Sequence, residues 1–419
     1  MMDVVILALL AAGFILFFGS FAEFIFKKFQ IPDVLFLILL GFIIGPSAFG
    51  IVSPLDLAAV APIFTTFTLL FLLFDGAFNI NLSSLLSEFS ESMLLTGWNF
   101  FVSSLVGFLT LLLFGFTVTQ SLFVGFALGG VSSSFVIPIL KQLKISERLM
   151  SLLTLESALT DVFCIVFSLA VLEFVQLGTS SVQGTFAQII ALFAVGAAVG
   201  LAAGVFWFTL QIKVFKEHNY MLTVAYLLII YVLTEFLQGS GAIAALFFGL
   251  VLANSKKISS IFKGITSDKA KDKKKALRGD LGISIITRSE EYFYDQISFF
   301  LKTFFFVYVG ILIDISNTRA LLIGGILSVA ILLSRRATNL LKTIVNNANK
   351  GLIDSMFARG LAAAAIAQIA ISSGFPGATE LSGIIYVTIA GTIILSSFSI
   401  LLEEYKKKHT KNSKVNGNS

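Results

Sequence analysis

Cysteine, histidine and charged residues are all scarce in this chain of 419 residues. The single cysteine, Cys164, excludes an internal disulfide framework, and its apolar surroundings favour a packing role. The two histidines, His218 and His409, lie in polar segments, which excludes a buried site built from soft or transition-metal ligands. Charged residues make up 13% of the chain, against about 25% in soluble domains. We therefore expect a polytopic membrane protein rather than an enzyme, and the net charge of +5 does not indicate nucleic acid as a partner.

Long apolar runs predict thirteen membrane-spanning helices, since one span needs about 20 apolar residues. The ninth is short and is separated from the eighth only by Gln238-Gly239-Ser240-Gly241, so twelve spans with a re-entrant segment are the alternative. In order, spans 1 to 13 cover residues 4–26, 34–51, 58–79, 92–117, 120–141, 149–175, 185–210, 219–237, 240–254, 295–315, 320–344, 352–374 and 380–402.

Basic residues are confined almost entirely to the connections after odd-numbered spans. The exception is the connection after span 3, which carries only Glu88 and Glu91, whereas connections after even-numbered spans hold one basic residue, Arg319. By the positive-inside rule the N-terminus is outside and the C-terminus cytoplasmic. The Lys-rich loop 255–294 is expected to be solvated or to lie on anionic headgroups, with a regulatory role as the alternative. Residues 404–419 are expected to be disordered.

A short internal similarity relates the ends of spans 3 and 10, residues 73–80 and 308–315. Each has aromatic residues, then a glycine, then an apolar exit. The two segments are seven spans apart and therefore run in opposite directions. This favours two inverted repeats of six spans joined by span 7, a transporter plan with its site at the repeat interface.

The stretch from Leu155 to Asp161 in span 6 places two carboxylates and two hydroxyls inside the apolar run 149–175. Ionisable side chains at such depth are costly and mark ion or proton pathways by default. Helical spacing puts Ser157 and Asp161 on one face and Glu156 and Thr160 on another, roughly 140° round the axis. One face is therefore predicted to hold an ion, and the other to need a structural partner.

Further polar residues reach the same depth from other spans. At ~1.5 Å per residue, Glu156 and Asp161 lie roughly 10–18 Å from the cytoplasmic start of span 6. Lys302 in span 10 is instead expected to snorkel to the cytoplasmic surface. This convergence predicts one buried polar site, to which the other contributors are Arg335 and Arg336 in span 11, residues 129–134 in span 5, Arg359-Gly360 in span 12 and, somewhat shallower, Asp75 in span 3.

The run Gly129-Gly130-Val131-Ser132-Ser133-Ser134 in span 5 has two interpretations. Glycine weakens a helix and serine competes for backbone hydrogen bonds, so the span could be broken and offer free carbonyl groups to a cation. Alternatively, the small residues only let helices approach closely. The segment from Gly360 to Ala370 in span 12 could be its pseudo-symmetric partner, although close packing is favoured there.

Carboxylate, hydroxyl and carbonyl oxygens are ligands that suit hard cations such as sodium. An aspartate that holds either a cation or a proton is a sufficient device for antiport, which needs no cofactor. A channel is the competing class, but no repeated filter motif is readable. A carrier of organic anions is a further alternative, which would need basic or amide groups facing the ligand.

The motif in span 6, with its companions in spans 3, 5, 11 and 12, resembles the monovalent cation/proton antiporter superfamily over nearly the whole chain. The electroneutral sodium/proton branch carries Glu-Ser-x-x-Asn-Asp in the sixth of thirteen helices, here Glu156 to Asp161. The resemblance implies an arginine of span 11 as the partner of Glu156, without deciding between Arg335 and Arg336. It also implies an unwound helix at Ser132 to Ser134. The transport residues it suggests are Asp161, Glu156, Arg335 and Arg336; the ligands of the sodium ion are Asp161, Ser157 and Ser134, with Thr160 and Asp75 beside them; and Ser132, Ser133, Gly130 and Arg359 are cavity-lining or structural.

Two departures from the family pattern concern ion selectivity. Thr160 replaces the asparagine of the motif. Ser134-Phe135-Val136 also replaces the Thr-Asp-Pro of the electroneutral branch and looks like the branch that includes potassium-efflux systems. The expected activity is electroneutral exchange of one sodium or lithium ion for one proton, with potassium/proton exchange as the alternative.

The fold implied by this resemblance is an all-α homodimer in the cell membrane. Its six-helix core has crossed broken helices, and the remaining helices form the dimer contact. On this plan residues 1–79 are spans 1–3 of the dimer or scaffold domain, 92–175 the first half of the core, 185–315 the linker and the rest of the scaffold, 320–402 the second half of the core, and 403–419 a cytoplasmic tail.

Overall fold

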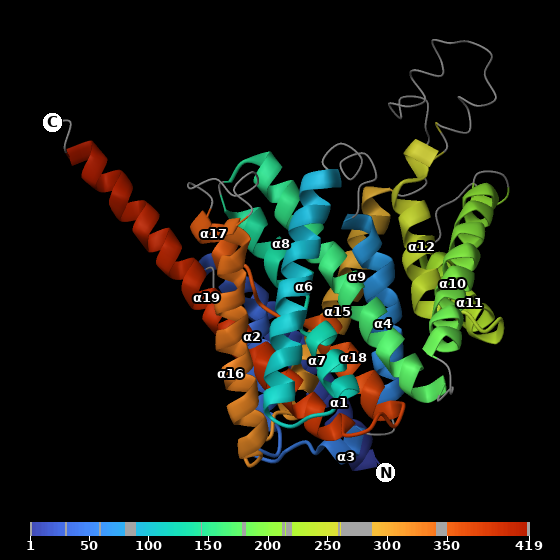
Figure 1. The fold of residues 1–419 in the computed structure, drawn as a ribbon, viewed down its shortest axis with the longest axis horizontal. Coiled ribbons are helices and arrows are strands. Elements are labelled where there is room, and N and C mark those ends of the chain that lie inside the picture. The colour runs from blue at the N-terminus through green and yellow to red at the C-terminus, as the bar shows by residue number, and fades with distance from the viewer. Residues whose placement is uncertain are drawn as a thin grey trace, which may run out of the picture. The chain divides into compact units, whose positions relative to one another are not determined.

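The described part of the chain consists of helices and connecting segments, with no strand (Figure 1). The structure is a computed structural model. It describes residues 2–29, 32–57, 60–79, 89–143, 145–177, 182–211, 214, 220–258, 260, 287–340 and 350–416.

Each of the thirteen predicted ranges holds one helix or the two halves of a broken one. Among the described residues, five helices are long and apolar enough to cross a membrane, and seven shorter ones are apolar; the number of spans remains a prediction. In span order the helices are α1 (Met2–Phe29), α2 (Asp33–Ile44), α4 (Ala61–Gly76), α6 (Phe89–Leu113), α7 (Val118–Ala127) with α8 (Ser133–Gln142), α9 (Glu147–Leu177), α10 (Val182–Leu210), α11 (Tyr220–Phe236), α12 (Gly241–Ala253), α15 (Arg288–Ile311), α16 (Thr318–Arg335), α17 (Lys350–Ser355) with α18 (Leu361–Ser372), and α19 (Ala378–Asn416). Shorter pieces are α3 (Pro54–Leu57), η1 (Ala77–Asn79) and η3 (Arg336–Leu340).

Local sequence explains where several helices begin. Thr117 and Gln120 form a capping box at the start of α7, each side chain binding the other residue's backbone N–H. Asn317 caps α16 by accepting a hydrogen bond from the backbone N–H of Ala320. The break between α11 and α12 contains Gln238 with φ of 56°. The chain therefore forms two separate helices where we expected spans 8 and 9 to divide, and the alternative of a re-entrant segment stays open.

Spans 5 and 12 are both interrupted. In span 5 the chain leaves helical geometry between α7 and α8, over residues 128–132. In span 12 it is non-helical between α17 and α18, over residues 356–360. The broken interpretation therefore holds for span 5, and span 12 is broken as well, as the resemblance implied. The segment of span 12 from Gly360 to Ala370, where we favoured close packing, is almost entirely the buried helix α18, and the break lies just before it. Both are the fifth helix of a six-helix set, which agrees with two repeats joined by span 7.

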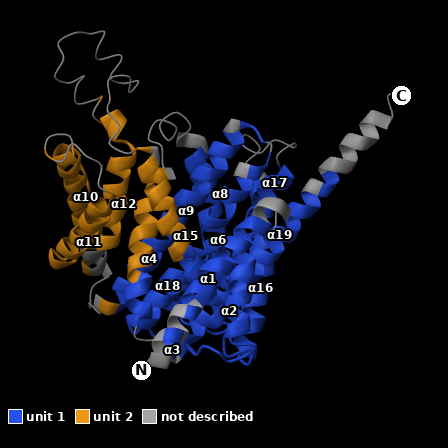
Figure 2. Ribbon diagram, turned by 180° about the vertical axis from the view of Figure 1, so that it is seen from behind, with its two compact units in different colours: residues 1–65, 90–175, 302–419 blue, residues 66–89, 176–301 orange. Residues whose placement is uncertain are grey.

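The contacts divide the chain into two compact units (Figure 2). Unit 1 comprises residues 1–65, 90–175 and 302–419, and unit 2 comprises residues 66–89 and 176–301. This division groups the first two predicted spans with spans 4–6 and 11–13. It follows contacts only, so the predicted core and dimer roles remain predictions.

Helix α2 and the unit-1 part of α15 pack closely at two glycines and an ion pair. A Cβ on Gly41 would lie 3.0 Å from the Cα of Gly310, a spacing that side chains would prevent. The ammonium group of Lys302 lies 2.6 Å from the carboxylate of Asp33, whose side chain is 7% exposed. Lys302 thus has a carboxylate partner that the sequence did not reveal, and its expected position at the cytoplasmic surface remains a prediction.

The predicted tail begins inside a helix. α19 continues through Asn416, so the expectation of disorder was wrong for residues 404–416. Glutamate and lysine are good helix formers, and Lys406 pairs with Glu403 over 2.8 Å at i,i+3 spacing. Residues 261–286 of the Lys-rich loop lie outside the described residues.

Candidate functional site at two crossed helix breaks

The break in span 5 is held by side chains and backbone of other helices in unit 1. Backbone groups inside a membrane need hydrogen-bond partners, because no water is there to supply them. All four N–H groups from residue 130 to residue 133 have one. The bonds run from Gly130 to Sγ of Cys164 (2.9 Å), from Val131 to Oγ1 of Thr160 (3.0 Å), from Ser132 to the carbonyl of Ala358 (2.9 Å) and from Ser133 to Oδ2 of Asp161 (3.0 Å).

The side chain of Asp161, which belongs to α9, contacts the N-terminus of the half-helix α8. Ser133, the first residue of α8, donates to Oδ2 of Asp161 from its backbone N–H over 3.0 Å and from its hydroxyl over 2.5 Å. The positive end of a helix dipole favours a carboxylate at this place. Asp161 is buried, at 8% exposure. Both hydrogen bonds that it accepts from described residues go to Oδ2, so Oδ1 is left for a ligand.

Arg359 lies at the opposite end of the break, where α7 ends. Its guanidinium donates to the carbonyl oxygens of Gly129, over 3.3 Å, and of Gly130. A second nitrogen donates to the hydroxyl of Ser103 over 2.8 Å. Carbonyl groups at a helix C-terminus carry partial negative charge, which a buried cation offsets. Arg359 therefore occupies two carbonyl groups of the broken segment that would otherwise be free to face a cation.

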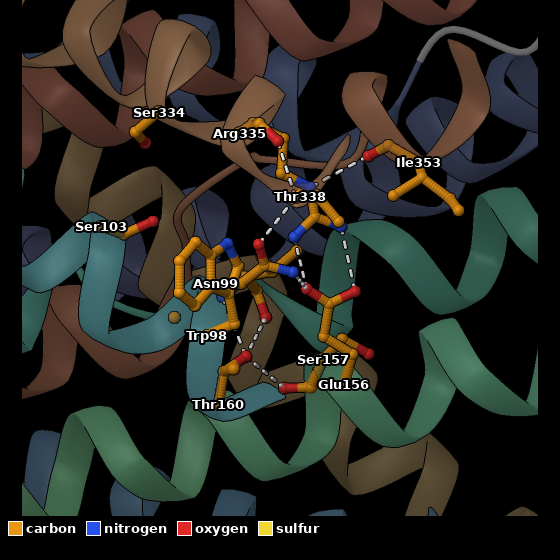
Figure 3. Close-up of polar contacts among 12 residues, drawn as sticks. Trp98, Asn99, Ser103, Glu156, Ser157, Thr160, Ser334, Arg335, Thr338 and Ile353 are labelled. Carbon is orange, nitrogen blue, oxygen red and sulfur yellow. Dashed lines mark hydrogen bonds and ion pairs between the residues drawn. The ribbon is translucent and has the colours of Figure 1, made fainter. Parts of the chain in front are cut away.

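Glu156 and Arg335 form a buried bidentate ion pair (Figure 3). One guanidinium nitrogen contacts Oε1, and the other lies 2.9 Å from Oε2. The side chains of Glu156 and Arg335 are 1% and 3% exposed. The Nε of Arg335 also donates to the carbonyl of Ile353, which precedes the break in span 12. Of the two arginines left open by the sequence, Arg335 is the partner, whereas Arg336 caps α16 and is exposed.

Asn99 on α6 extends this network and was not singled out from the sequence. Its amide nitrogen donates to Oε1 of Glu156 over 2.6 Å, and its amide oxygen accepts from the hydroxyl of Thr338 over 2.7 Å (Figure 3). A lone amide within the apolar run of span 4 was the available signal. Cys164 also has more than a packing role, since its thiol accepts the hydrogen bond from Gly130.

The three remaining oxygen ligands predicted for span 5 and span 6 are all in unit 1. Ser157 is buried and donates to the carbonyl of Thr154 over 3.0 Å. Thr160 uses its hydroxyl on the backbone of Val131. Ser134 lies in the first turn of α8. The unwound segment covers residues 128–132, whereas we expected it at Ser132 to Ser134. Their roles as ion ligands remain predictions.

Asp75 belongs to unit 2, and the other predicted site residues belong to unit 1. Within unit 2 the hydroxyl of Ser298 donates to Oδ2 of Asp75 over 2.6 Å. The predicted proximity of this carboxylate to Asp161 remains a prediction.

The two breaks lie in close contact at Gly360, which leads to a prediction. A Cβ on Gly360 would meet the side chain of Ser132, with Cβ to Cβ at 2.6 Å. Gly360→Ala should therefore push the two segments apart and reduce transport in vesicles at least about tenfold, since sites tolerate little misplacement. Gly325→Ala on α16 is the matched control, because nothing lies within 4 Å of its added Cβ. Equal transport by the two variants would contradict the assigned crossing.

The fold and part of the sequence are similar to known sodium/proton antiporters. The structure of the antiporter MjNhaP1 from Methanocaldococcus jannaschii at pH 8 matches with a TM-score of 0.72 and 21% identity, covering 94% of this chain and 98% of that one. An electron-microscopy structure of MjNhaP1 matches with a TM-score of 0.68, covering 95% of each chain. The Na(+)/H(+) antiporter ApNhaP from Aphanothece halophytica is 32% identical over 190 residues, 44% of this chain and 36% of that one. The matched part thus spans about a third of the length of this curated relative.

A family model extends the likeness to nearly the full length. The model for the transmembrane part of sodium/hydrogen exchangers matches residues 13–402, which include both broken spans and the motif of span 6. This protein therefore belongs to the sodium/hydrogen exchanger family.

Proposed function

We propose that this multi-pass membrane protein exchanges sodium ions for protons, and that the two compete for Asp161. The observation that carries the proposal is the position of this carboxylate at the N-terminus of α8, beside two crossed helix breaks. Ser133 holds Oδ2, whereas Oδ1 accepts no hydrogen bond from the described residues. Membership in the sodium/hydrogen exchanger family supports the identity of the two ions.

Oxygen ligands for the ion are available next to Asp161. We propose that Ser157, one helical turn before it, contributes its hydroxyl oxygen. The carbonyl of Ser134 is a second candidate, because the residue four positions later is Pro138, which has no N–H to donate to it. Such a carbonyl in the first turn of a half-helix can bind a cation.

We propose that the exchange is electroneutral. Asp161 carries either one sodium ion or one proton, so each half of the cycle moves the same charge. Glu156 does not alter this balance, because Arg335 compensates its charge in a buried pair. Thr160 is proposed to line the site. The cell membrane, the cytoplasmic C-terminus and the homodimer are further proposals, which the charge distribution and the family support.

Reconstituted vesicles test the proposed exchange. A sodium pulse should collapse an imposed pH gradient, and the rate should be the same when a potassium diffusion potential of either sign is applied. Empty vesicles give the background. A rate that follows the applied potential would refute electroneutrality, and no response to sodium would refute the proposed exchange. The same assay with lithium and with potassium ranks the ions, and a preference for potassium would favour the alternative named above.

A further inference from the structure

The segment that interrupts span 12 is held at both ends by hydroxyl groups of α19. The backbone N–H of Arg359 donates to Oγ1 of Thr392 over 3.0 Å. The hydroxyl of Ser396 donates to the carbonyl of Ser355 over 2.5 Å. Ser355 is the last residue of α17, and Arg359 directly precedes the N-cap of α18. Because this non-helical segment lacks helical hydrogen bonds, such contacts decide its path.

The hydroxyl of Thr392 is itself oriented. It donates to the carbonyl of Thr388 over 2.8 Å, which leaves a lone pair for the N–H of Arg359. Thr392 is fully buried, at 0% exposure. Water therefore cannot readily replace this acceptor, and its loss would leave the N–H of Arg359 without a partner.

The path of residues 356–360 determines which groups of span 12 contact the break in span 5. The carbonyl of Ala358, next to Arg359, accepts the N–H of Ser132 over 2.9 Å. Ser132 is the N-cap of α8, whose first residue binds Asp161. The side chain of Arg359 starts from the same point and reaches the carbonyl of Gly130.

We propose that Thr392, assisted by Ser396, is a positioning residue of the ion site. By holding residues 356–360 from α19, it sets the direction in which α8 presents its N-terminus to Asp161. Thr392 contacts neither Asp161 nor the ligands proposed for the ion. This inference rests on the proposed function, because the site that it positions is the proposed exchange site.

Thr392→Val tests the inference, since valine keeps the shape and removes the acceptor. The apparent KM for sodium in vesicles should rise about tenfold, with turnover at saturating sodium changed less than about threefold. Thr388→Val is the matched control. Thr388 is one turn away and equally buried. Its hydroxyl bonds to the carbonyl of Ile384 over 2.8 Å in its own helix and to the carbonyl of Gly324 on α16 over 3.5 Å, so it does not hold residues 356–360. The control should stay within about twofold, and Thr392→Ser should restore the wild-type KM.

A second readout does not depend on transport. Cys164 is the single cysteine of the chain, is 2% exposed, and accepts the N–H of Gly130 at the crossing. Its rate of labelling by N-ethylmaleimide in membranes should rise about tenfold in Thr392→Val, because a looser crossing opens more often. Thr388→Val should label like the wild type.

These readouts separate the possible failures. Unchanged KM and labelling in Thr392→Val, or equal changes in Thr388→Val, would overturn the positioning role. A wild-type protein that exchanges no cation, while labelling differs as described, would refute the proposed exchange and leave the positioning role standing. If Thr392→Val does not accumulate, Ser396→Ala replaces it in both assays. Its control is then Ser397→Ala, a hydroxyl that bonds only within α19, to Ile393.

Discussion

Asp161→Asn is expected to reduce sodium-driven proton exchange below about 1% of the wild-type rate, the loss typical of a group without which the reaction has no carrier. The amide has neither a charge to attract a sodium ion nor a proton to release at physiological pH. Its oxygen can still accept the two hydrogen bonds from Ser133, so the crossing should stay folded. The measurement is the collapse of an imposed pH gradient in vesicles after a sodium pulse.

Asp314→Asn is the control for loss of one carboxylate. Asp314 is exposed, lies outside the apolar helices, and bonds locally to Ser316. This variant should transport at the wild-type rate. Substantial sodium-driven exchange by folded Asp161→Asn would remove Asp161 from the proposed mechanism.

Arg335→Ala is expected to destabilise the protein by about 3–5 kcal/mol, because it leaves Glu156 as an uncompensated charge in a buried site. The carbonyl of Ile353 would also lose the hydrogen bond that it accepts from Arg335, and Asn99 would remain bonded to a carboxylate whose charge is uncompensated. Thermal unfolding in detergent measures the effect. The control is Arg319→Ala, which removes an exposed ion pair with Glu380 and should change stability by about 1 kcal/mol or less.

The double variant Glu156→Gln/Arg335→Met distinguishes a structural pair from a transporting one. Replacing both charges removes the penalty of an isolated one, so stability should recover most of what Arg335→Ala loses. Recovered transport would then identify the pair as scaffold. Recovered stability without transport would show that the charge itself takes part in the exchange. A single variant Arg335→Ala as stable as the wild type would contradict the buried ion pair.

The depth of the site residues along their helices was predictable from the sequence, but the direction in which each side chain points around its helix axis was not. Counting residues brought Glu156 and the two arginines of span 11 to similar levels. Adjacent residues on a helix point about 100° apart, however, and only packing decides which one faces the partner. The pairing with Arg335 therefore had to come from the structure.

The two helix breaks show the same limit. In span 5 the Gly-Gly and triple-serine run weakens a helix locally, so the break was readable from the sequence. In span 12 only Gly360 gives such a signal, and residues 356–359 are ordinary helix formers. Their non-helical path depends on Ser132 and Thr392, which are distant in sequence. Asn99 and Lys302 were likewise explained only by partners that no local pattern reveals.

The distances along the chain between the crossing partners bear on how this protein is made. Glu156 and Arg335 are 179 residues apart, and the guanidinium of Arg359 reaches back 229 residues to Gly130. A ribosome that has just released span 6 into the membrane leaves Asp161 and the opened backbone of span 5 without half of their partners. The first half of the chain must therefore persist in an incomplete state until synthesis reaches span 12. Any quality-control factor that surveys membrane insertion would meet this protein in that state, with its costliest residues still without their later partners.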